Sequence, residues 1–176
     1  PKWYWWQTEA ENLQTQWRTT PMATDFDGDG QLDLVILDQE GYLTCQSRAR
    51  EETRIFLDED LAPIRLNART AGRSGRVKLA VVDWNGDGHL DVLLNGTNAE
   101  LHEGRPGPEG SYVLTNRGPI APRDISSPST SPTVVDWNRD GVLDVLAGSA
   151  DESTLSVHMG PIATGASVRR MTVTPT

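Results

Sequence analysis

The stretch Asp25-Phe-Asp-Gly-Asp-Gly-Gln-Leu-Asp33 is the most informative part of this chain, because its pattern recurs twice. The second copy is Asp83-Trp-Asn-Gly-Asp-Gly-His-Leu-Asp91, and the third is Asp136-Trp-Asn-Arg-Asp-Gly-Val-Leu-Asp144. Each copy places oxygen-bearing side chains at loop positions 1, 3, 5 and 9, with a glycine at position 6. Hard cations such as Ca²⁺ bind about six to eight oxygens around one point. Because crowded carboxylates repel one another without a cation, the pattern predicts three Ca²⁺ sites.

Short apolar runs flank every loop, and the loops begin 58 and 53 residues apart. Self-similarity at such a period is typical of repeat architectures. Runs rich in Val, Leu and Ile, bounded by Gly, Asn and Asp, predict strands, and no window shows a sustained helical stripe. We therefore predict an all-β chain of small antiparallel sheets, each with a metal loop between its first two strands. Radial arrangement of such sheets gives a β-propeller. The predicted repeat units of this single domain cover residues 20–57, 77–116 and 131–175.

The loops resemble the calcium loops of FG-GAP and VCBS-type repeats, which build integrin alpha-subunit propellers and many bacterial secreted propellers. An EF-hand is excluded, because position 12 is Ile36, Leu94 or Ala147 where that loop needs an acidic ligand. The resemblance implies that the side chains at positions 1, 3, 5 and 9, and the backbone carbonyl at position 7, hold the ions. The implied ligands are Asp25, Asp27, Asp29, Gln31 and Asp33; Asp83, Asn85, Asp87, His89 and Asp91; and Asp136, Asn138, Asp140, Val142 and Asp144.

The alternative is that these are Asp- and Asn-rich turns without metal, held by side-chain hydrogen bonds to the backbone. In both cases the glycines at position 6 should allow a sharp bend with positive φ. They are Gly30, Gly88 and Gly141. Arg139 replaces the glycine of position 4 in the third loop. We expect its side chain to point to solvent, with a weakened third site as the alternative.

The formal net charge is −9, and its source is the loops. They hold ten carboxylates, whereas the other 15 acidic residues face 16 Lys and Arg residues. A near-neutral remainder argues against nucleic acid as a partner, and no apolar run is long enough to span a membrane. Cys45 is the single cysteine and is expected to be a small buried residue. Loosely held Ca²⁺ suits an extracellular or cell-surface protein, with the periplasm as a further option.

Three recognisable units do not close a ring, since closed propellers have about four to eight blades. Residues 168–175 are a candidate last strand of the third unit. The cluster from Trp3 to Trp6, with Trp17, is a candidate outer part of a preceding blade. About three to three and a half blades then favour a segment of a seven-bladed propeller. The partners expected at its open edges are the remaining blades or another copy of the chain.

The connection between the first two units carries Arg65, Arg69, Arg73 and Arg76, which could bind a uronate or sulfate. The alternative is a solvated loop whose arginines pair with Asp58, Glu59 and Asp60. The aromatic residues at loop position 2 favour packing between blades; they are Phe26, Trp84 and Trp137. His102 and His158 fall at similar places, where the first unit has Cys45, which indicates scaffold roles.

Three hypotheses for function follow. The first is a calcium-stabilised propeller module that binds a glycan or an extracellular protein, without catalytic residues of its own. The second is the propeller part of a polysaccharide lyase, in which a His, a Tyr such as Tyr42 or Tyr112 and an Arg would abstract a proton and neutralise charge. The third is a cell-surface adhesion protein, as the integrin resemblance implies.

Overall fold

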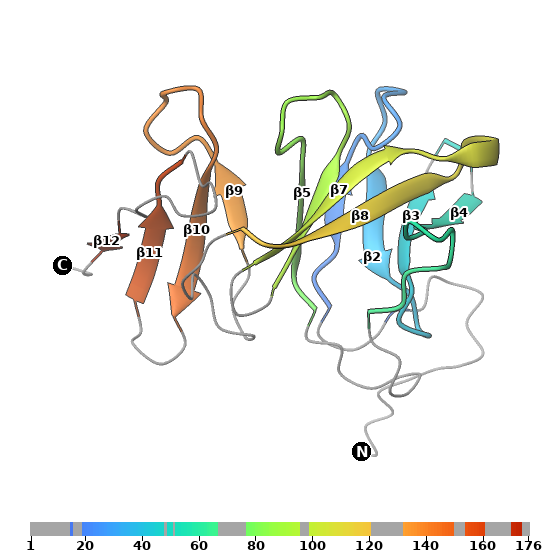
Figure 1. Ribbon diagram of the computed structural model, residues 1–176, viewed down its shortest axis with the longest axis horizontal. Coiled ribbons are helices and arrows are strands. Elements are labelled where there is room, and N and C mark those ends of the chain that lie inside the picture. Colours follow the sequence, from blue (N-terminus) through green and yellow to red (C-terminus); the bar gives the residue numbers. More distant parts are fainter. Residues whose placement is uncertain are drawn as a thin grey trace, which may run out of the picture.

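The computed structural model is all-β, and three four-stranded antiparallel sheets lie side by side in it (Figure 1). It describes residues 15, 19–47, 49–50, 52–66, 77–95, 99–120, 132–149, 154–160 and 170–173. Within these ranges the only helix is the 3-10 turn η1 (Pro108–Gly110). No helix in the described part of the chain is long and apolar enough to cross a membrane. The predicted all-β fold of blade-like sheets is confirmed.

Each sheet is a meander, in which strands that follow one another along the chain are hydrogen-bonded neighbours. The first sheet contains β1 (Met22–Thr24), β2 (Asp33–Leu37), β3 (Leu43–Ser47) and β4 (Glu52–Ile55). The second contains β5 (Leu79–Val82), β6 (Asp91–Leu94), β7 (Glu100–Pro106) and β8 (Tyr112–Pro119). The third contains β9 (Thr133–Val135), β10 (Asp144–Ser149), β11 (Thr154–His158) and β12 (Arg170–Val173).

Every nine-residue loop joins the first and second strands of its sheet, and position 9 is the first residue of the second strand. The three loops project from the same end of the sheets, which is the top in Figure 1. The stretch 168–175 does supply a last strand, because β12 pairs with β11. The tryptophan cluster from Trp3 to Trp6, and Trp17, lie outside the described residues.

Two hydrophobic cores join the sheets, one at each junction. The first core contains Val35 of β2 together with Val92 and Leu94 of β6. The second contains Leu93 of β6 together with Val145 of β10. Successive residues of β6 therefore face opposite neighbours, as the period-2 alternation of a strand requires. A middle sheet that is covered on both faces explains why its second strand is apolar throughout after Asp91.

Three aromatic rings strengthen the first core. The ring centroids of Phe26 and Phe56 lie 5.2 Å apart, those of Phe26 and Tyr112 4.8 Å and those of Phe56 and Tyr112 5.8 Å. All three pairs are edge-to-face, the arrangement that the ring quadrupoles favour. Phe26 comes from the first loop and Tyr112 from β8, so the aromatic residue at loop position 2 packs against the following sheet, as predicted.

The repeat leaves one face of the first sheet and one face of the third without a neighbouring sheet among the described residues. At loop position 8, Leu90 packs against the first core, whereas its counterpart Leu32 is 60% exposed. At loop position 2, Trp84 packs against the second core, whereas Trp137 is 48% exposed. Trp137 thus departs from the predicted packing between blades, because no described sheet follows the third. We name these surfaces the leading face (Leu32) and the trailing face (Trp137 and Val135).

Candidate metal centre

Left-handed backbone shapes each loop at two positions. At position 6 the predicted positive φ is confirmed: +85°, +87° and +85° at Gly30, Gly88 and Gly141. Position 4 is also left-handed, with +76° at Gly28, +75° at Gly86 and +62° at Arg139. A side chain pays a steric penalty in this region that glycine does not, so Arg139 is the strained member of the set. Its side chain is exposed, as predicted.

The three loops share one set of hydrogen bonds. The carboxylate at position 1 accepts the position 6 N–H, at 3.0, 2.9 and 2.9 Å for Asp25, Asp83 and Asp136. The carboxylate at position 5 accepts the position 7 N–H, at 2.8 Å in each loop, from Gln31, His89 and Val142. These bonds fix one oxygen of each carboxylate toward the loop backbone. The backbone carbonyls of position 7 remain predicted ligands.

The carboxylates at position 9 are buried beneath the loops. Oδ2 of Asp33, Asp91 and Asp144 accepts the position 2 N–H, at 3.1, 2.8 and 2.9 Å. In the second and third sheets Oδ1 also accepts a backbone N–H at 2.7 Å, from Gly104 and Gly160 respectively. Burial raises the pKa of Asp91, although the hydrogen bonds that it accepts from Gly104 and Trp84 oppose the shift. Position 9 therefore joins the loop to the sheet in addition to its predicted role as a ligand.

Gly104 and Gly160 are functional positions that sequence reasoning missed. A Cβ at Gly104 would overlap Leu90 O, and a Cβ at Gly160 would overlap Leu143 O, so only glycine fits. The recurring tripeptides His102-Glu-Gly104 and His158-Met-Gly160 were the available signal. The first unit has Gln46-Ser-Arg48 in their place, and Arg48 lies outside the described residues.

The first loop differs from the others at position 3, where Asp27 replaces an asparagine. In the second loop Asn85 Nδ2 donates to Asp87 Oδ2 at 2.9 Å, and in the third Asn138 Nδ2 donates to Asp140 Oδ2 at 2.7 Å. Such a donor is lacking at Asp27, and three carboxylate oxygens of the first loop are buried without a hydrogen-bond partner in the described structure. They are Asp25 Oδ1, Asp33 Oδ1 and Asp27 Oδ2, and the last of these faces the guanidinium of Arg50 at 3.2 Å.

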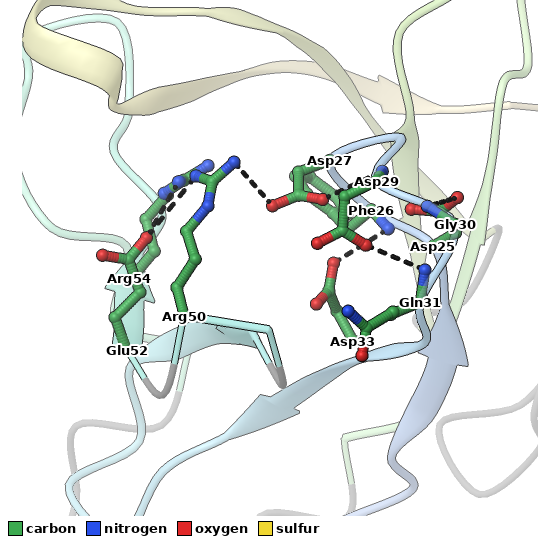
Figure 2. A network of polar contacts seen from close by, with 10 residues as sticks. All are labelled: Asp25, Phe26, Asp27, Asp29, Gly30, Gln31, Asp33, Arg50, Glu52 and Arg54. Carbon is green, nitrogen blue, oxygen red and sulfur yellow. Dashed lines mark hydrogen bonds and ion pairs between the residues drawn. The ribbon is translucent and has the colours of Figure 1, made fainter.

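Asp25, Asp27 and Asp29 each place a carboxylate oxygen within 4.8 Å of the others. Two oxygens on opposite sides of a Ca²⁺ ion lie about 4.6–5.2 Å apart, twice the usual bond length. Buried carboxylate oxygens without a proton donor are costly unless a cation compensates them. The residues of the first loop therefore fit a divalent cation, which Asp25, Asp27 and Asp29 would hold. Asp33 does not belong to this group, although it lies directly beneath it (Figure 2).

Arg50 reaches the same carboxylate group from the turn between β3 and β4. Its Nη2 lies 3.2 Å from Asp27 Oδ2, and its Nη1 lies 3.7 Å from Glu52 Oε1 (Figure 2). Arg54 also pairs with Glu52, at 3.2 Å. The Asp27 side chain is only 10% exposed, whereas that of Arg50 is 50% exposed. A guanidinium group thus partly neutralises the first loop in this structure.

A cleft of about 480 Å³ opens beside the first loop. Its walls come from the first loop, the second loop, β4 and the turn around η1. The polar and charged side chains that line it are Asp25, Asp27, Arg54, His89, Ser111 and Tyr112. The Tyr112 hydroxyl donates to Leu90 O at 2.8 Å, and burial raises its pKa. This hydroxyl is thus occupied in holding the second loop against β8.

Of the predicted arginine cluster, only Arg65 lies within the described residues. Its Nε donates to Glu40 O at 2.7 Å, its Nη2 pairs with Glu40 Oε2 at 3.3 Å, and its guanidinium lies 5.2 Å from the centre of the Tyr42 ring. The solvated-loop interpretation named Asp58 as a partner, but Asp58 Oδ1 instead accepts the N–H groups of its own turn, from Asp60 and Ala62. Arg69, Arg73 and Arg76 lie outside the described residues.

The two buried histidines occupy equivalent scaffold positions. His102 pairs with Val92 and His158 with Val145, and both valines directly follow position 9. In the first sheet that place belongs to Gln46, not Cys45, so the predicted alignment was wrong by one residue. Burial lowers the pKa of His102. Cys45 is buried in the first core as predicted, and burial raises its pKa to about 12.

These loops and sheets define a class of repeat in which an acidic nine-residue loop joins the first two strands of a blade-like β-sheet. The family of FG-GAP-like repeats matches the chain over residues 25–94 and 83–147. Because these two matches together cover more than half of the sequence, the chain belongs to the FG-GAP-like repeat family. No curated protein and no solved structure matches the chain significantly.

Proposed function

We propose that this chain is a Ca²⁺-stabilised β-propeller module whose role is binding or scaffolding in a secreted or cell-surface protein. The observation that carries the proposal is the first loop, where the carboxylates of Asp25, Asp27 and Asp29 converge and the buried oxygens Asp25 Oδ1 and Asp33 Oδ1 have neither a hydrogen-bond partner nor an ion pair in the described structure. The shared hydrogen bonds of positions 1 and 5 extend the same design to the other two loops. Membership of the FG-GAP-like repeat family supports calcium over other cations.

The physical role of the ions follows from their place in the fold. Each loop connects the first two strands of a sheet and carries three or four acidic side chains. A cation that binds only the folded loop stabilises the folded state by mass action. It also offsets repulsion between carboxylates that otherwise opposes the turn. The ions are therefore structural, and the same dependence on free Ca²⁺ favours an extracellular setting, where weak calcium modules stay saturated.

Thermal unfolding with and without a chelator tests the proposal. At a free Ca²⁺ concentration of about 100 times Kd, one site adds about 2.7 kcal/mol. For a chain of this size, that is about 5–10 °C in Tm. Asp87→Ala should reduce the calcium-induced rise, whereas Asp60→Ala, an exposed aspartate outside the loops, should leave it unchanged. A Tm that neither calcium nor chelator moves would show that the loops are metal-free turns.

The cleft beside the first loop is the part of the module that supports ligand binding. It joins carboxylates, an arginine and open backbone at Gly28, Gly88 and Gly110 within one concave surface. Glycans and extended protein segments both present the hydroxyl and amide groups that such a surface can bind. Binding of immobilised glycans, with loss of signal for Arg54→Ala, supports a carbohydrate ligand. A protein ligand retained by the same cleft supports the adhesion hypothesis.

The polysaccharide lyase remains a second candidate, because the cleft also gathers Arg54, His89 and Tyr112. These are the residue types that abstract a proton and neutralise the charge of a uronate during β-elimination. Against it, the Tyr112 hydroxyl already donates to a backbone carbonyl. A rise in ultraviolet absorbance from unsaturated uronate products would favour the lyase, and binding without product would favour the module.

The exposed side chains of the leading and trailing faces support a further partner. Leu32 and Trp137 occupy positions that pack against a neighbouring sheet elsewhere in the repeat. A sheet of the same kind, supplied by the remaining blades of a propeller or by another copy of the chain, would cover them. Such packing repeats the two internal junctions and requires no new type of contact.

A further inference from the structure

We propose that the Arg50 guanidinium competes with the cation of the first loop for Asp27, and so lowers the affinity of this site below the value that its four carboxylates would otherwise give. The inference rests on the proposed function, in which the loops bind Ca²⁺. It concerns a residue outside the loop motif, 23 positions after Asp27. It gives Arg50 a role in tuning the cation affinity of the first loop, which the other two loops do not share.

Charge alone predicts the opposite order of affinities. The first loop has four aspartates at positions 1, 3, 5 and 9, whereas the second and third loops have three aspartates and one asparagine. A ligand set with more negative charge binds Ca²⁺ more tightly when all else is equal. The first loop should then bind its ion most tightly, unless another positive charge already neutralises part of its carboxylate charge.

Arg50 supplies that cation. Its Nη2 lies 3.2 Å from Asp27 Oδ2, which is the oxygen of Asp27 that accepts no hydrogen bond and is buried from solvent. The other oxygen, Oδ1, accepts the N–H of Asp29 at 3.3 Å. The oxygen free to bind a metal ion is thus the one that faces the guanidinium. One carboxylate oxygen cannot offer its full charge to both cations, and the two cations repel each other.

The second and third loops carry an asparagine at position 3 and need no arginine to compensate that position, and Arg139 of the third loop is exposed and makes no ion pair among the described residues. Asn85 and Asn138 each donate Nδ2 to the neighbouring position 5 carboxylate. An amide carries no net charge, so it opposes a bound cation far less than a guanidinium does. Asp27 and Arg50 therefore form a matched pair, in which the extra charge of the loop is compensated by a residue from the adjacent turn.

Glu52 gives the guanidinium an alternative partner once a metal ion has bound. The guanidinium contacts both acidic residues at once: Nη1 lies 3.7 Å from Glu52 Oε1 while Nη2 lies near Asp27 (Figure 2). Arg50 can therefore give up Asp27 without losing every anionic contact. Half of its side chain is exposed, so the exchange needs no rearrangement of a core. Solvent screens the half-exposed guanidinium, so its effect on the affinity is a modest one.

Calorimetric titration of the chelator-treated chain with CaCl₂ at low ionic strength tests the inference. Arg50→Gln removes the charge and keeps most of the side chain, and it should lower the Kd of one class of sites about three- to five-fold. Arg117→Gln is the matched control, because it changes the net charge equally at an arginine that pairs with Glu103 on the second sheet. It should leave every Kd unchanged.

A double-mutant cycle locates the effect at the first loop. Asp27→Asn gives this loop the residue found at position 3 of the other two, and Arg50 should then lose its influence. The affinity gain of Arg50→Gln must therefore disappear in the Asp27→Asn background. An equal gain in calcium affinity in both backgrounds, or no gain in the original one, contradicts the proposed competition between Arg50 and the cation. If the unaltered chain binds no Ca²⁺, the proposed function fails together with this inference, whereas calcium binding that Arg50→Gln leaves unchanged overturns the inference alone.

Discussion

Gly104 donates its backbone N–H to Oδ1 of Asp91 at 2.7 Å, and this bond joins the third strand of the second sheet to the end of the nine-residue loop. Gly160 and Asp144 repeat the relationship at the same distance in the third sheet. The contact requires a backbone that approaches the strand more closely than any side chain permits. A buried carboxylate is thereby satisfied by two backbone donors, which stabilises it without an ion pair.

Gly104→Ala should destabilise the chain by about 2–3 kcal/mol, because the added methyl group overlaps Leu90 O and the Tyr112 ring. Displacement of the backbone would also deprive Asp91 of a donor. Gly110→Ala is the control: its φ is +77°, but no atom lies within 4 Å of the added carbon. Urea unfolding should show the larger loss for Gly104. Equal losses at both positions would mean that the close contact at Gly104 costs no more than the left-handed backbone conformation at Gly110.

The sequence pattern was sufficient to predict the loops, their place between the first two strands and the positive φ at position 6. These features are local, since each depends on residues within nine positions of one another. Gly104 and Arg50 were missed for the opposite reason, because their partners Asp91 and Asp27 lie 13 and 23 residues away. A glycine that makes room for a carbonyl looks the same in sequence as a glycine in a turn.

Arg139→Gly should stabilise the chain by up to about 1 kcal/mol, because it removes a side chain from a left-handed conformation with φ of +62°. The gain is limited, since glycine also loses more conformational freedom on folding. Gly86→Ala is the reciprocal change at the equivalent position of the second loop, where φ is +75°. It should destabilise by a similar amount in the same chemical denaturation experiment. A destabilised Arg139→Gly variant would indicate a favourable contact of the arginine.

His102→Gln should weaken the response of the chain to mild acid. Burial lowers the pKa of His102 below its ordinary value of 6.5, so the unfolded chain takes up a proton that the folded chain resists. This resistance costs stability as the pH falls below 6.5, and the cost grows until the folded-state pKa is reached. Denaturation at pH 7.5 and at pH 5.5, about one unit either side of that value, should therefore show a smaller loss of stability on acidification for the variant. An unchanged loss would assign the acid sensitivity to other groups.

Cys45 should resist thiol reagents while the chain is folded. It is buried in the first core, and burial raises its pKa to about 12, so almost no thiolate forms at neutral pH. Labelling should become fast only in denaturant, with a midpoint that matches the unfolding transition. Cys45→Ala is the control for reaction elsewhere and should show no labelling. Rapid modification of the folded chain would place the thiol at the surface and contradict the packing of the first core.

Trp84→Ser and Trp137→Ser should destabilise the chain to different extents, because one lies at a junction between sheets and the other on an exposed face. Both tryptophans occupy loop position 2, but Trp84 packs against the second core whereas Trp137 is 48% exposed. Trp84→Ser should cost about 2–3 kcal/mol, and Trp137→Ser about 1 kcal/mol or less. If another copy covers the trailing face, Trp137→Ser should also reduce concentration-dependent association in sedimentation experiments, whereas Arg117→Gln should not. If the chain stays monomeric at all concentrations, another copy does not cover Trp137. Of the two proposed partners, the remaining blades of a propeller would then be the one left.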